Sequence, residues 1–404
     1  MTAMALLPVD EALRLLLEGA ERLGGETVPL ALAASRVLAA PVIALRTQPP
    51  FDASAMDGYA VRAADTASAP ATLSVIGEAP AGRRFAGEVG SGQAVRIFTG
   101  APVPAGADTI LIQENARVLG PEKIEALEPV SAGRHIRRAG LDFEEGEPLL
   151  EAGRVLDAAA LSLAAAANHA ALDVVRRPLV AILATGDELL PPGSTPGPDQ
   201  IIASNAYGVA AVAEADGARV LDLGIVPDRK NLIAASLRRA LAEGADIVVT
   251  LGGASVGDHD LVREVLVDLG VAIDFWKIAM RPGKPLMFGR IGTTRVLGLP
   301  GNPVASLVCS HLFLRPLVAR LASRDYLPDL RDAVAGAPMA ANDQRRDYVR
   351  ASVAGPAGAL VATPFPVQDS SMLKTMAAAN ALIVRAPFAP ALDAGEACRI
   401  LMLR

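Results

Sequence analysis

The pattern of apolar positions is clearest between residues 178 and 322, where short apolar runs alternate with amphipathic segments. The runs LVAILAT, RVLDLGIV, DIVVTL, VAIDFWKI, PLMFGRI and TRVLGL predict strands, because short apolar runs bounded by turn residues are typical of a buried sheet. Helical patterns lie between the strands at 204–215, 229–242 and 260–268. This alternation, at a spacing of roughly 30 residues, predicts βαβ units and a doubly wound, mostly parallel α/β sheet.

Other helices are predicted outside this pattern. Residues 10–23 place leucines on one helical face, and Asp10 is a candidate N-cap. An Ala-rich helix is expected around 157–170, and a long helix capped by Asn302, with proline in its first position. The uncharged run 296–314 nearly reaches membrane length, but a Pro-Gly-Asn-Pro turn interrupts it. We therefore predict a buried strand, a loop and a buried helix there, and no membrane span.

The remaining segments have the short apolar alternations and the Gly and Pro turns of small β domains. One such region separates two stretches rich in Leu and Ala, which we expect to pack beside each other. Four domains are therefore predicted: a discontinuous helical linking domain (1–44 and 141–177), an inserted β-rich domain (45–140), the α/β domain (178–326) and a small C-terminal β domain (327–404).

Composition narrows the classes of function. Of the 404 residues, 51% are hydrophobic and 20% are charged, so the chain can bury real cores and is not disordered. A net charge of −6 gives no basic footprint, which argues against nucleic acid as a partner. The N-terminus lacks the basic segment of a secretory signal. Cys309 and Cys398 lie too far apart for a metal-binding motif, so a reducing cytoplasm is the expected location.

Charged and glycine-rich segments follow the predicted strands, where open parallel sheets bind their ligands. TGDE follows the first strand, PD the second and LGGASVGDHD the third, while RPGKP and LPGNP adjoin the later ones. Carboxylates suit Mg²⁺ bound together with a phosphate, and Lys and Arg suit the phosphate or another oxyanion. The sequence thus predicts a site for a phosphorylated anion and a divalent metal. Its candidate acids and bases are Glu188, Asp228, Asp258, Asp260, Lys277, Arg281 and Lys284.

Each of these segments alone has a simpler interpretation. TGDE and LPGNP are typical of helix starts, PGKP is typical of a tight turn, and GGAS lacks the Gly-Lys-Ser/Thr of a phosphate-binding loop. Their convergence on one edge of the sheet favours a site. The four histidines show no metal-ligand spacing.

The β-rich region carries its own candidates. FDASAMDGYAVR and FTGAPVPAGAD place Asp57 and Thr99 in predicted turns, and RHIRRAGLD contains Arg137 and Asp142. A turn acid bonded to its own backbone is the simpler interpretation of Asp57, and a surface ion pair is the simpler interpretation of the arginines.

Together these segments resemble the molybdopterin molybdenumtransferase family, known as MoeA or the gephyrin E-domain. The matching strings FDASAMDGYAVR, FTGAPVP, RHIRRAG, ATGDEL, LGGASVGDHD, RPGKP and LPGNPVAS occur in the order of the family. The resemblance implies insertion of molybdate into adenylylated molybdopterin with release of AMP and the help of Mg²⁺. It also implies an elongated homodimer of four-domain subunits, with the α/β domain of one subunit facing the inserted β domain of the other.

The resemblance assigns roles to individual residues. It implies that Glu188, Asp228 and Asp260 act in catalysis and hold Mg²⁺, and that Asp57 and Thr99 are catalytic residues of the opposite subunit. Position 281 is Lys in some members of the family, and Arg there keeps the charge but changes the shape of the group. The implied substrate-binding residues are Arg137, Asp142, Ser255, Asp258, Lys277, Arg281, Lys284, Pro300, Arg350 and Ser371.

Two other functions remain open at this point. A molybdopterin adenylyltransferase has a single α/β domain that resembles residues 178–322, and such an enzyme is also the expected partner that supplies the substrate. A non-enzymatic scaffold is the third possibility, since gephyrin-type members cluster receptors. The additional β domains favour the insertase over the adenylyltransferase, and the full set of acids and bases argues against a purely structural role.

Overall fold

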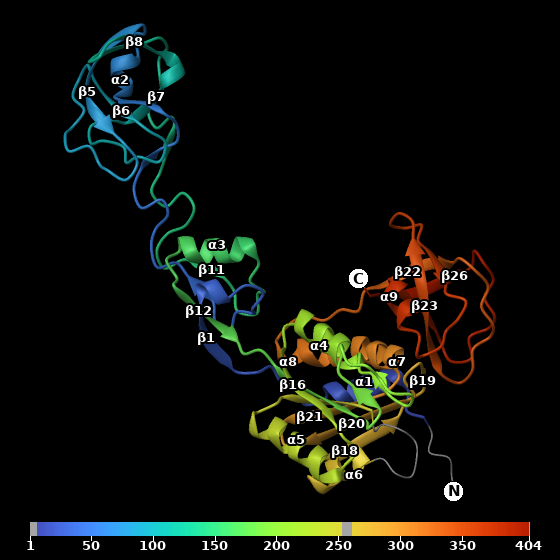
Figure 1. Cartoon of the computed structure of the whole chain (residues 1–404). Coiled ribbons are helices and arrows are strands. Elements are labelled where there is room, and N and C mark those ends of the chain that lie inside the picture. Colours follow the sequence, from blue (N-terminus) through green and yellow to red (C-terminus); the bar gives the residue numbers. More distant parts are fainter. Residues whose placement is uncertain (1–5, 253–260, 404) are drawn as a thin grey trace. The chain divides into compact units, whose positions relative to one another are not determined.

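The computed structural model describes residues 6–252 and 261–403, and the chain forms two compact units (Figure 1). The first unit comprises Met1–Glu26, Ser35–Val37 and Val174–Arg404, and the second comprises Thr27–Ala34 and Leu38–Asp173.

A six-stranded sheet lies at the centre of the first unit. Its order is β16-β13-β17-β21-β20-β18. Strands β16, β13, β17 and β21 are parallel, whereas β20 runs antiparallel to both of its neighbours. The prediction of a doubly wound, mostly parallel sheet is confirmed. The strands are β13 (Leu179–Thr185), β16 (Arg219–Val226), β17 (Ile247–Leu251), β18 (Ala272–Lys277), β20 (Pro285–Ile291) and β21 (Thr294–Leu299).

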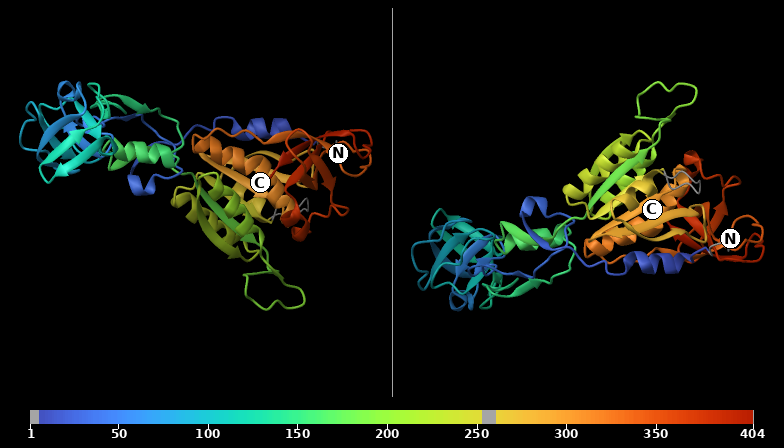
Figure 2. Two further views of the ribbon diagram at one scale, coloured as in Figure 1. Left: turned by 90° about the horizontal axis from the view of Figure 1, so that it is seen from above. Right: turned by 90° about the horizontal axis from the view of Figure 1, so that it is seen from below.

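Helices cover both faces of this sheet (Figure 1). Helices α5 and α6 share one apolar cluster with the sheet, and α1, α4, α7 and α8 share the other. The bounds are α1 (Val9–Leu17), α4 (Asn205–Ala215), α5 (Lys230–Ala242), α6 (Leu261–Asp268), α7 (Pro303–Cys309) and α8 (Arg315–Leu321). Short strands β14 (Leu189–Leu190) and β15 (Ile201–Ile202) flank an exposed loop, which extends away from the sheet in Figure 2.

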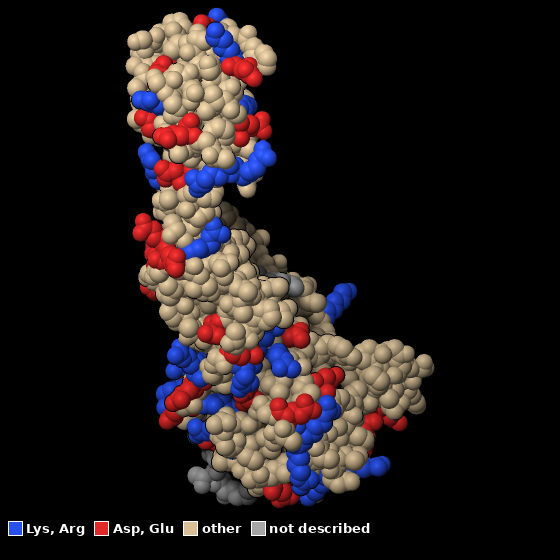
Figure 3. Space-filling view, turned by 90° about the vertical axis from the view of Figure 1, so that its left-hand side faces the viewer, with Lys and Arg blue, Asp and Glu red and all other residues tan. Residues whose placement is uncertain are grey.

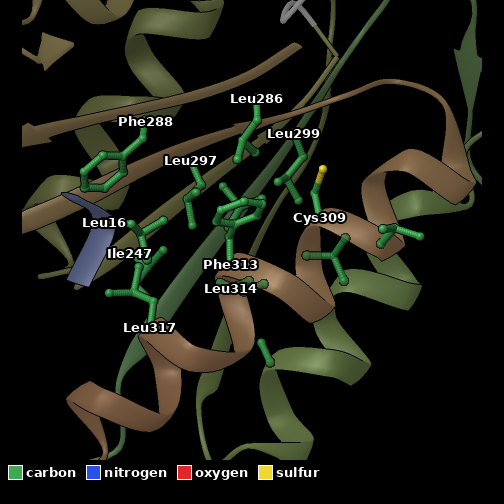
Figure 4. Packing of buried hydrophobic residues seen from close by; sticks show 14 of the residues in the cluster. Leu16, Ile247, Leu286, Phe288, Leu297, Leu299, Cys309, Phe313, Leu314 and Leu317 are labelled. Carbon is green, nitrogen blue, oxygen red and sulfur yellow. The ribbon is translucent and has the colours of Figure 1, made fainter. Parts of the chain in front are cut away.

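The larger core joins the sheet to the helix that follows β21 (Figure 4). Phe288 and Leu297 of the sheet pack with Phe313 and Leu317 of the helix, and Leu16 of α1 joins the same cluster. Burying each such side chain stabilises the fold by about 1.5–3 kcal/mol. Because aromatic residues are only 3% of the chain, Leu, Val and Ile fill most of this cluster.

The segment 303–321 is helical throughout, with a π turn (Ser310–Leu314) between α7 and α8. Pro316 follows this turn and has no N–H to donate to the preceding turn of the helix, which accounts for the irregularity. The helix is long and apolar enough to cross a membrane, but 72% of its most apolar window is buried in the protein. The predicted buried core helix is confirmed.

His311 lies in this helix, and its burial lowers its pKa to about 4, with a further contribution from Arg315 that Asp216 opposes. The unfolded chain, with a His pKa near 6.5, therefore binds this proton more readily than the folded protein does. We expect stability to fall by up to about 3 kcal/mol as the pH drops from 6.5 through 4. Urea unfolding at pH 6.5 and at pH 4 measures this loss of unfolding free energy, and we expect a smaller loss in His311→Gln. A loss in the variant as large as in the wild-type protein would contradict this role of His311.

One predicted cap is wrong, and the other is confirmed in position but makes no side-chain capping hydrogen bond. The N-cap of α1 is Pro8, and Asp10 instead forms a bidentate ion pair with Arg346 at 2.6 and 2.7 Å. The helix ends at Leu17, earlier than predicted. Asn302 occupies the N-cap position of α7, but its side chain donates to Ser370 Oγ at 2.9 Å and makes no capping hydrogen bond. Both side chains are engaged by residues that are distant in the sequence.

The C-terminal part of the first unit is a small β structure, as predicted. Its sheet order is β19-β23-β24-β22-β26-β25, and an additional pairing of β23 with β25 closes it into a barrel. The short strand β19 comes from the α/β region, between β18 and β20. The elements are β19 (Met280–Arg281), β22 (Leu330–Ala335), β23 (Arg346–Ala354), β24 (Val361–Pro364), α9 (Leu373–Ala378), β25 (Ala381–Arg385) and β26 (Ala397–Met402).

The second unit contains a sheet of order β7-β4-β6-β5-β9-β8 and several two-stranded pairings. Strand β2 pairs with β11, and Ala44, Phe143 and Ala167 share a small core. The chain segments that precede and follow this sheet in the sequence therefore pack together. The boundaries of four separate domains remain a prediction. The sheet strands are β4 (Gly58–Val61), β5 (Ala71–Ala79), β6 (Gln93–Ile97), β7 (Thr109–Ile112), β8 (Ala116–Gly120) and β9 (Lys123–Ala126). The other elements are β1 (Gly25–Pro29), β2 (Val42–Ile43), β3 (Ala53–Ser54), α2 (Ala63–Thr66), β10 (Ile136–Arg137), β11 (Pro148–Leu150), α3 (Ala158–Ala166) and β12 (Ala171–Val175).

Candidate active site

A cleft of about 950 Å³ lies at the carboxyl edge of the six-stranded sheet, within the first unit. The loops after β13, β17 and β21 line it together with the turn before β20 and the start of α7. This is the edge at which open α/β sheets bind ligands. The cleft brings together five residues predicted from the sequence: Glu188, Arg281, Lys284, Pro300 and Ser371.

Two neighbouring carboxylates act on Asp228 beside the cleft. Burial raises the pKa of Asp228, and the charges of Asp187 and Glu188 raise it further. The backbone N–H of Asp228 donates to Asp187 Oδ1 at 3.2 Å, which fixes the two loops together. Because the carboxylates repel one another, a bound cation would relieve the repulsion and lower the pKa of Asp228. Asp187 was not among the residues predicted for the site, although the TGDE segment contains it.

These acids fit Mg²⁺ only in part. Within residues 6–252 and 261–403, no three His, Cys, Asp or Glu side chains gather closely enough to enclose a metal ion. Protein-bound Mg²⁺ commonly uses one or two carboxylates together with substrate phosphates, so Glu188 and Asp228 are compatible with such a site. The predicted residues Ser255, Asp258 and Asp260 lie outside the described residues.

The two lysines of the predicted site differ in their surroundings. Lys284 is exposed at the cleft, and its ammonium forms no ion pair with any described residue. Its carbonyl accepts from the N–H of Ile278 at 3.2 Å, so the turn is held through its backbone. Lys277 ends β18 in register with Pro285, which lines the cleft, but Lys277 itself is not a lining residue.

Among the candidate bases of the cleft, Arg281 is held in place by acidic side chains. Its Nε donates to Asp347 Oδ2 at 3.1 Å, and its Nη1 lies 3.7 Å from Asp343 Oδ2. The hydrogen bond with Asp347 raises the pKa of Arg281. Arg281 therefore connects the cleft to the C-terminal barrel, and part of its charge is already neutralised by acids that sequence reasoning did not link to it.

One wall of the cleft comes from the barrel, in the segment 368–371. Arg350 is only 1% exposed, and it holds this segment by donating to Gln368 Oε1 at 3.1 Å and to the carbonyl of Asp369 at 2.8 Å. Burial lowers the pKa of Arg350. The hydroxyl of Ser371 donates to Asp369 Oδ1 at 2.6 Å. Arg350 is thus placed behind the cleft wall, and it is not a lining residue.

Sequence reasoning missed several polar groups of the cleft. The hydroxyl of Thr185 is buried there with no hydrogen-bond partner among the described residues. Asn205 donates to the carbonyl of Gly301 at 2.7 Å and joins α4 to the loop before α7. A Cβ on Gly252 would lie 2.8 Å from the carbonyl oxygen of Thr185, and its φ is +90°, so only glycine fits that position. The available signal was the position of Thr185 at the end of β13.

In the second unit, Asp57 and Thr99 lie together. Asp57 Oδ1 accepts from the backbone N–H of Thr99 at 2.7 Å and from its hydroxyl at 2.8 Å, and these bonds lower the pKa of Asp57. A Cβ on Gly58 would lie 2.1 Å from the carbonyl oxygen of Leu111, so the residue after Asp57 must be glycine. The carboxylate is thus held by a residue distant in the sequence, and not by its own turn.

Arg137 and Asp142 are exposed in the second unit, and the structure gives neither a side-chain partner among the described residues. The neighbouring Arg138 pairs with Asp52. On the face of the molecule in Figure 3, Lys and Arg side chains alternate with Asp and Glu side chains. This face therefore carries both signs of charge and has no broad patch of one sign.

Comparison with known proteins identifies the class. Residues 7–168 match the MoeA N-terminal region (domain I and II), 181–320 match a probable molybdopterin binding domain, and 332–403 match the MoeA C-terminal region (domain IV). These three matches together cover most of the chain and define a multidomain protein of the MoeA type.

The chain belongs to the MoeA family of molybdopterin molybdenumtransferases. It is 34% identical to the molybdopterin molybdenumtransferase of Bacillus subtilis over 98% of this chain and 94% of that protein. It is 40% identical to that of a Nostoc species, over 73% of this chain and 69% of that protein. The MoeA crystal structure from Pyrococcus horikoshii, 28% identical, superposes with a TM-score of 0.82 over 99% of this chain and 100% of its own. The suspected family and the fold are confirmed.

Proposed function

We propose that this enzyme inserts molybdate into adenylylated molybdopterin, releases AMP and so forms molybdenum cofactor. The observation that carries the proposal is a single cleft in which Lys284, which has no ion pair with any described residue, lies among Glu188, Arg281 and Ser371. A reaction between two anions requires cationic groups to hold them against their mutual repulsion. Hydroxyl and backbone donors complete a site suited to a tetrahedral oxyanion such as molybdate.

Each of these residues has a separate role in the proposed reaction. Lys284 holds the anionic substrate and stabilises negative charge as AMP leaves. Arg281 supports Lys284 from the barrel side through its remaining donors, and Ser371 offers a hydroxyl at the cleft wall. Arg350 fixes the segment that carries Ser371. Arg137, Asp142 and Lys277 are proposed as further substrate contacts on the strength of the family resemblance alone.

Glu188 and Asp228, with Asp260, are the residues that would hold Mg²⁺. The ion, when bound, supplies positive charge to the phosphate oxygens at the bond that breaks. The raised pKa of Asp228 supports this assignment, because neighbouring carboxylates that repel one another favour a cation as their partner.

Asp260→Asn should abolish the Mg²⁺ dependence of AMP release together with most of the turnover. The amide keeps the size and one acceptor oxygen but removes the charge that a hard cation requires. Substrate binding should survive better than cleavage, because Lys284 still meets the phosphates. A Mg²⁺ titration of AMP release, with binding followed in parallel, makes the measurement. A variant that responds to Mg²⁺ at the wild-type midpoint would assign the metal to Glu188 and Asp228 without Asp260.

We further propose that the enzyme is a cytoplasmic homodimer in which Asp57 and Thr99 of one subunit complete the cleft of the other. The cleft is lined by residues of the first unit, whereas the bonded pair Asp57 and Thr99 belongs to the second. A molybdopterin adenylyltransferase is the proposed partner, because it makes the adenylylated substrate.

Product analysis separates the proposal from adenylyl transfer by the chain itself. The purified protein is incubated either with adenylylated molybdopterin, Mg²⁺ and molybdate, or with molybdopterin, Mg²⁺ and ATP. We expect AMP release in the first reaction and no adenylylation in the second. Transfer of AMP from ATP to molybdopterin would show that the chain is the adenylyltransferase.

A further inference from the structure

A second cleft, of about 490 Å³, lies at the opposite edge of the six-stranded sheet, where the parallel strands begin. Arg177 precedes β13, Arg219 begins β16 and Arg324 follows α8, and all three line this cleft. Its lining residues all belong to the first unit. The cleft is separate from the candidate active site, because that site occupies the carboxyl ends of the same strands.

Within the described part of the chain, the charge of these three arginines is only partly neutralised, by Asp216 acting on Arg324. None of them forms an ion pair there, and Glu214 is the one acid among the described residues that line the cleft. The nearby Asp216 is engaged by Arg315, whose Nε donates to it at 2.7 Å. Three positive groups therefore face one negative group in a small concave space.

One arginine donor is also buried without a partner. Arg177 Nε is inaccessible to solvent and has no hydrogen-bond partner among the described residues. Buried donors in native proteins are nearly always satisfied, so an unsatisfied one beside a cleft indicates a missing acceptor. An oxyanion in the cleft is the acceptor that matches a guanidinium group.

The absence of a side chain at Gly217 leaves room for the guanidinium of Arg324. Gly217 has a φ of +99°, and a Cβ there would lie 2.9 Å from Arg324 Nε and 3.1 Å from its Cζ. The guanidinium also donates to the carbonyl of Ser35. Burial lowers the pKa of Arg324, Asp216 opposes this shift, and the charge of Arg177 adds to it. The group is thus held in place beside a like charge, which a bound anion would stabilise.

We propose that this cleft binds a small phosphorylated anion through Arg177, Arg219 and Arg324. The fork of donors on a guanidinium matches phosphate oxygens, and a dianion matches the surplus of positive charge. The cleft volume falls within the range of about 300–1,000 Å³ that is usual for small-molecule sites. The site does not depend on the function proposed for the first cleft.

The test is protection of individual arginines from phenylglyoxal, read by peptide mass spectrometry on the wild-type protein. Pyrophosphate is the probe, and chloride and acetate at equal ionic strength are the controls. We expect pyrophosphate to slow the labelling of Arg219 and Arg324 at least tenfold. Arg238, exposed on α5 and without a side-chain partner among the described residues, should react at an unchanged rate.

Two variants test whether the protection by pyrophosphate arises from binding in this cleft. Arg177→Gln should raise the pyrophosphate concentration for half-protection of Arg219 at least tenfold, whereas Arg238→Gln should leave it unchanged. Equal labelling rates in pyrophosphate and chloride would overturn the proposal. Protection by acetate equal to that by pyrophosphate would overturn the phosphate specificity. Protection that needs no added anion and grows with protein concentration would assign the cleft to contact with a second copy of the chain, and would equally overturn it.

Discussion

Replacement of Lys284 by glutamine is expected to lower turnover by about 10²–10³-fold while leaving the melting temperature unchanged. Lys284 is exposed, its ammonium has no ion-pair partner in the described chain, and its turn is held by a backbone hydrogen bond. The fold therefore does not depend on the charge, whereas the anionic substrates do. AMP release measured against molybdate concentration, beside thermal unfolding, gives both quantities.

The matched control is Lys123→Gln in the second unit, which removes an exposed lysine of strand β9 that has no part in the proposed site. It should keep wild-type turnover. If the melting temperature of Lys284→Gln fell in proportion to its activity, the lysine would have a structural role. The proposed site would then lack its main anion-binding group.

Restored activity in a mixture of two inactive proteins is the second expected result. Asp57→Ala and Glu188→Ala should each be nearly inactive, because each removes a carboxylate proposed to act at the same site. If the two residues meet across a dimer, a heterodimer has one intact site and one doubly altered site. Random exchange of subunits then yields about one quarter of wild-type activity.

The measurement is AMP release after the two proteins have been mixed and their exchange verified with differently tagged subunits. Asp57→Ala mixed with Lys284→Gln should behave in the same way, because Lys284 lines the same cleft as Glu188. Glu188→Ala mixed with Lys284→Gln is the control, and it should stay inactive because both changes affect the same half of the site. Absence of rescue after confirmed exchange would contradict a site shared between subunits.

The sequence predicted the central sheet well because its strands are buried on both faces. Runs such as residues 179–185 and 247–251 are apolar at nearly every position, which leaves little choice of element. The order of strands and helices then places Glu188 and Lys284 on the same edge. Local signals were therefore sufficient for the part of the site that depends on the sheet.

The remainder depended on contacts between distant residues. Asp10 was a plausible helix cap, but Arg346 binds it. No local sequence pattern predicts a partner so distant along the chain. In the same way, Asp347 engages Arg281, and Arg350 secures the wall around Asp369 through bonds that form only once the barrel has folded. Such pairings follow from tertiary packing, which apolar periodicity does not encode.

We propose that this chain couples molybdate insertion to the release of AMP. The most direct measurement is the amount of AMP and of molybdenum cofactor formed in one reaction of the purified protein with adenylylated molybdopterin and Mg²⁺, with and without molybdate. We expect equal amounts of the two products with molybdate and little AMP without it. AMP released at the same rate in both reactions, with no cofactor formed, would contradict it.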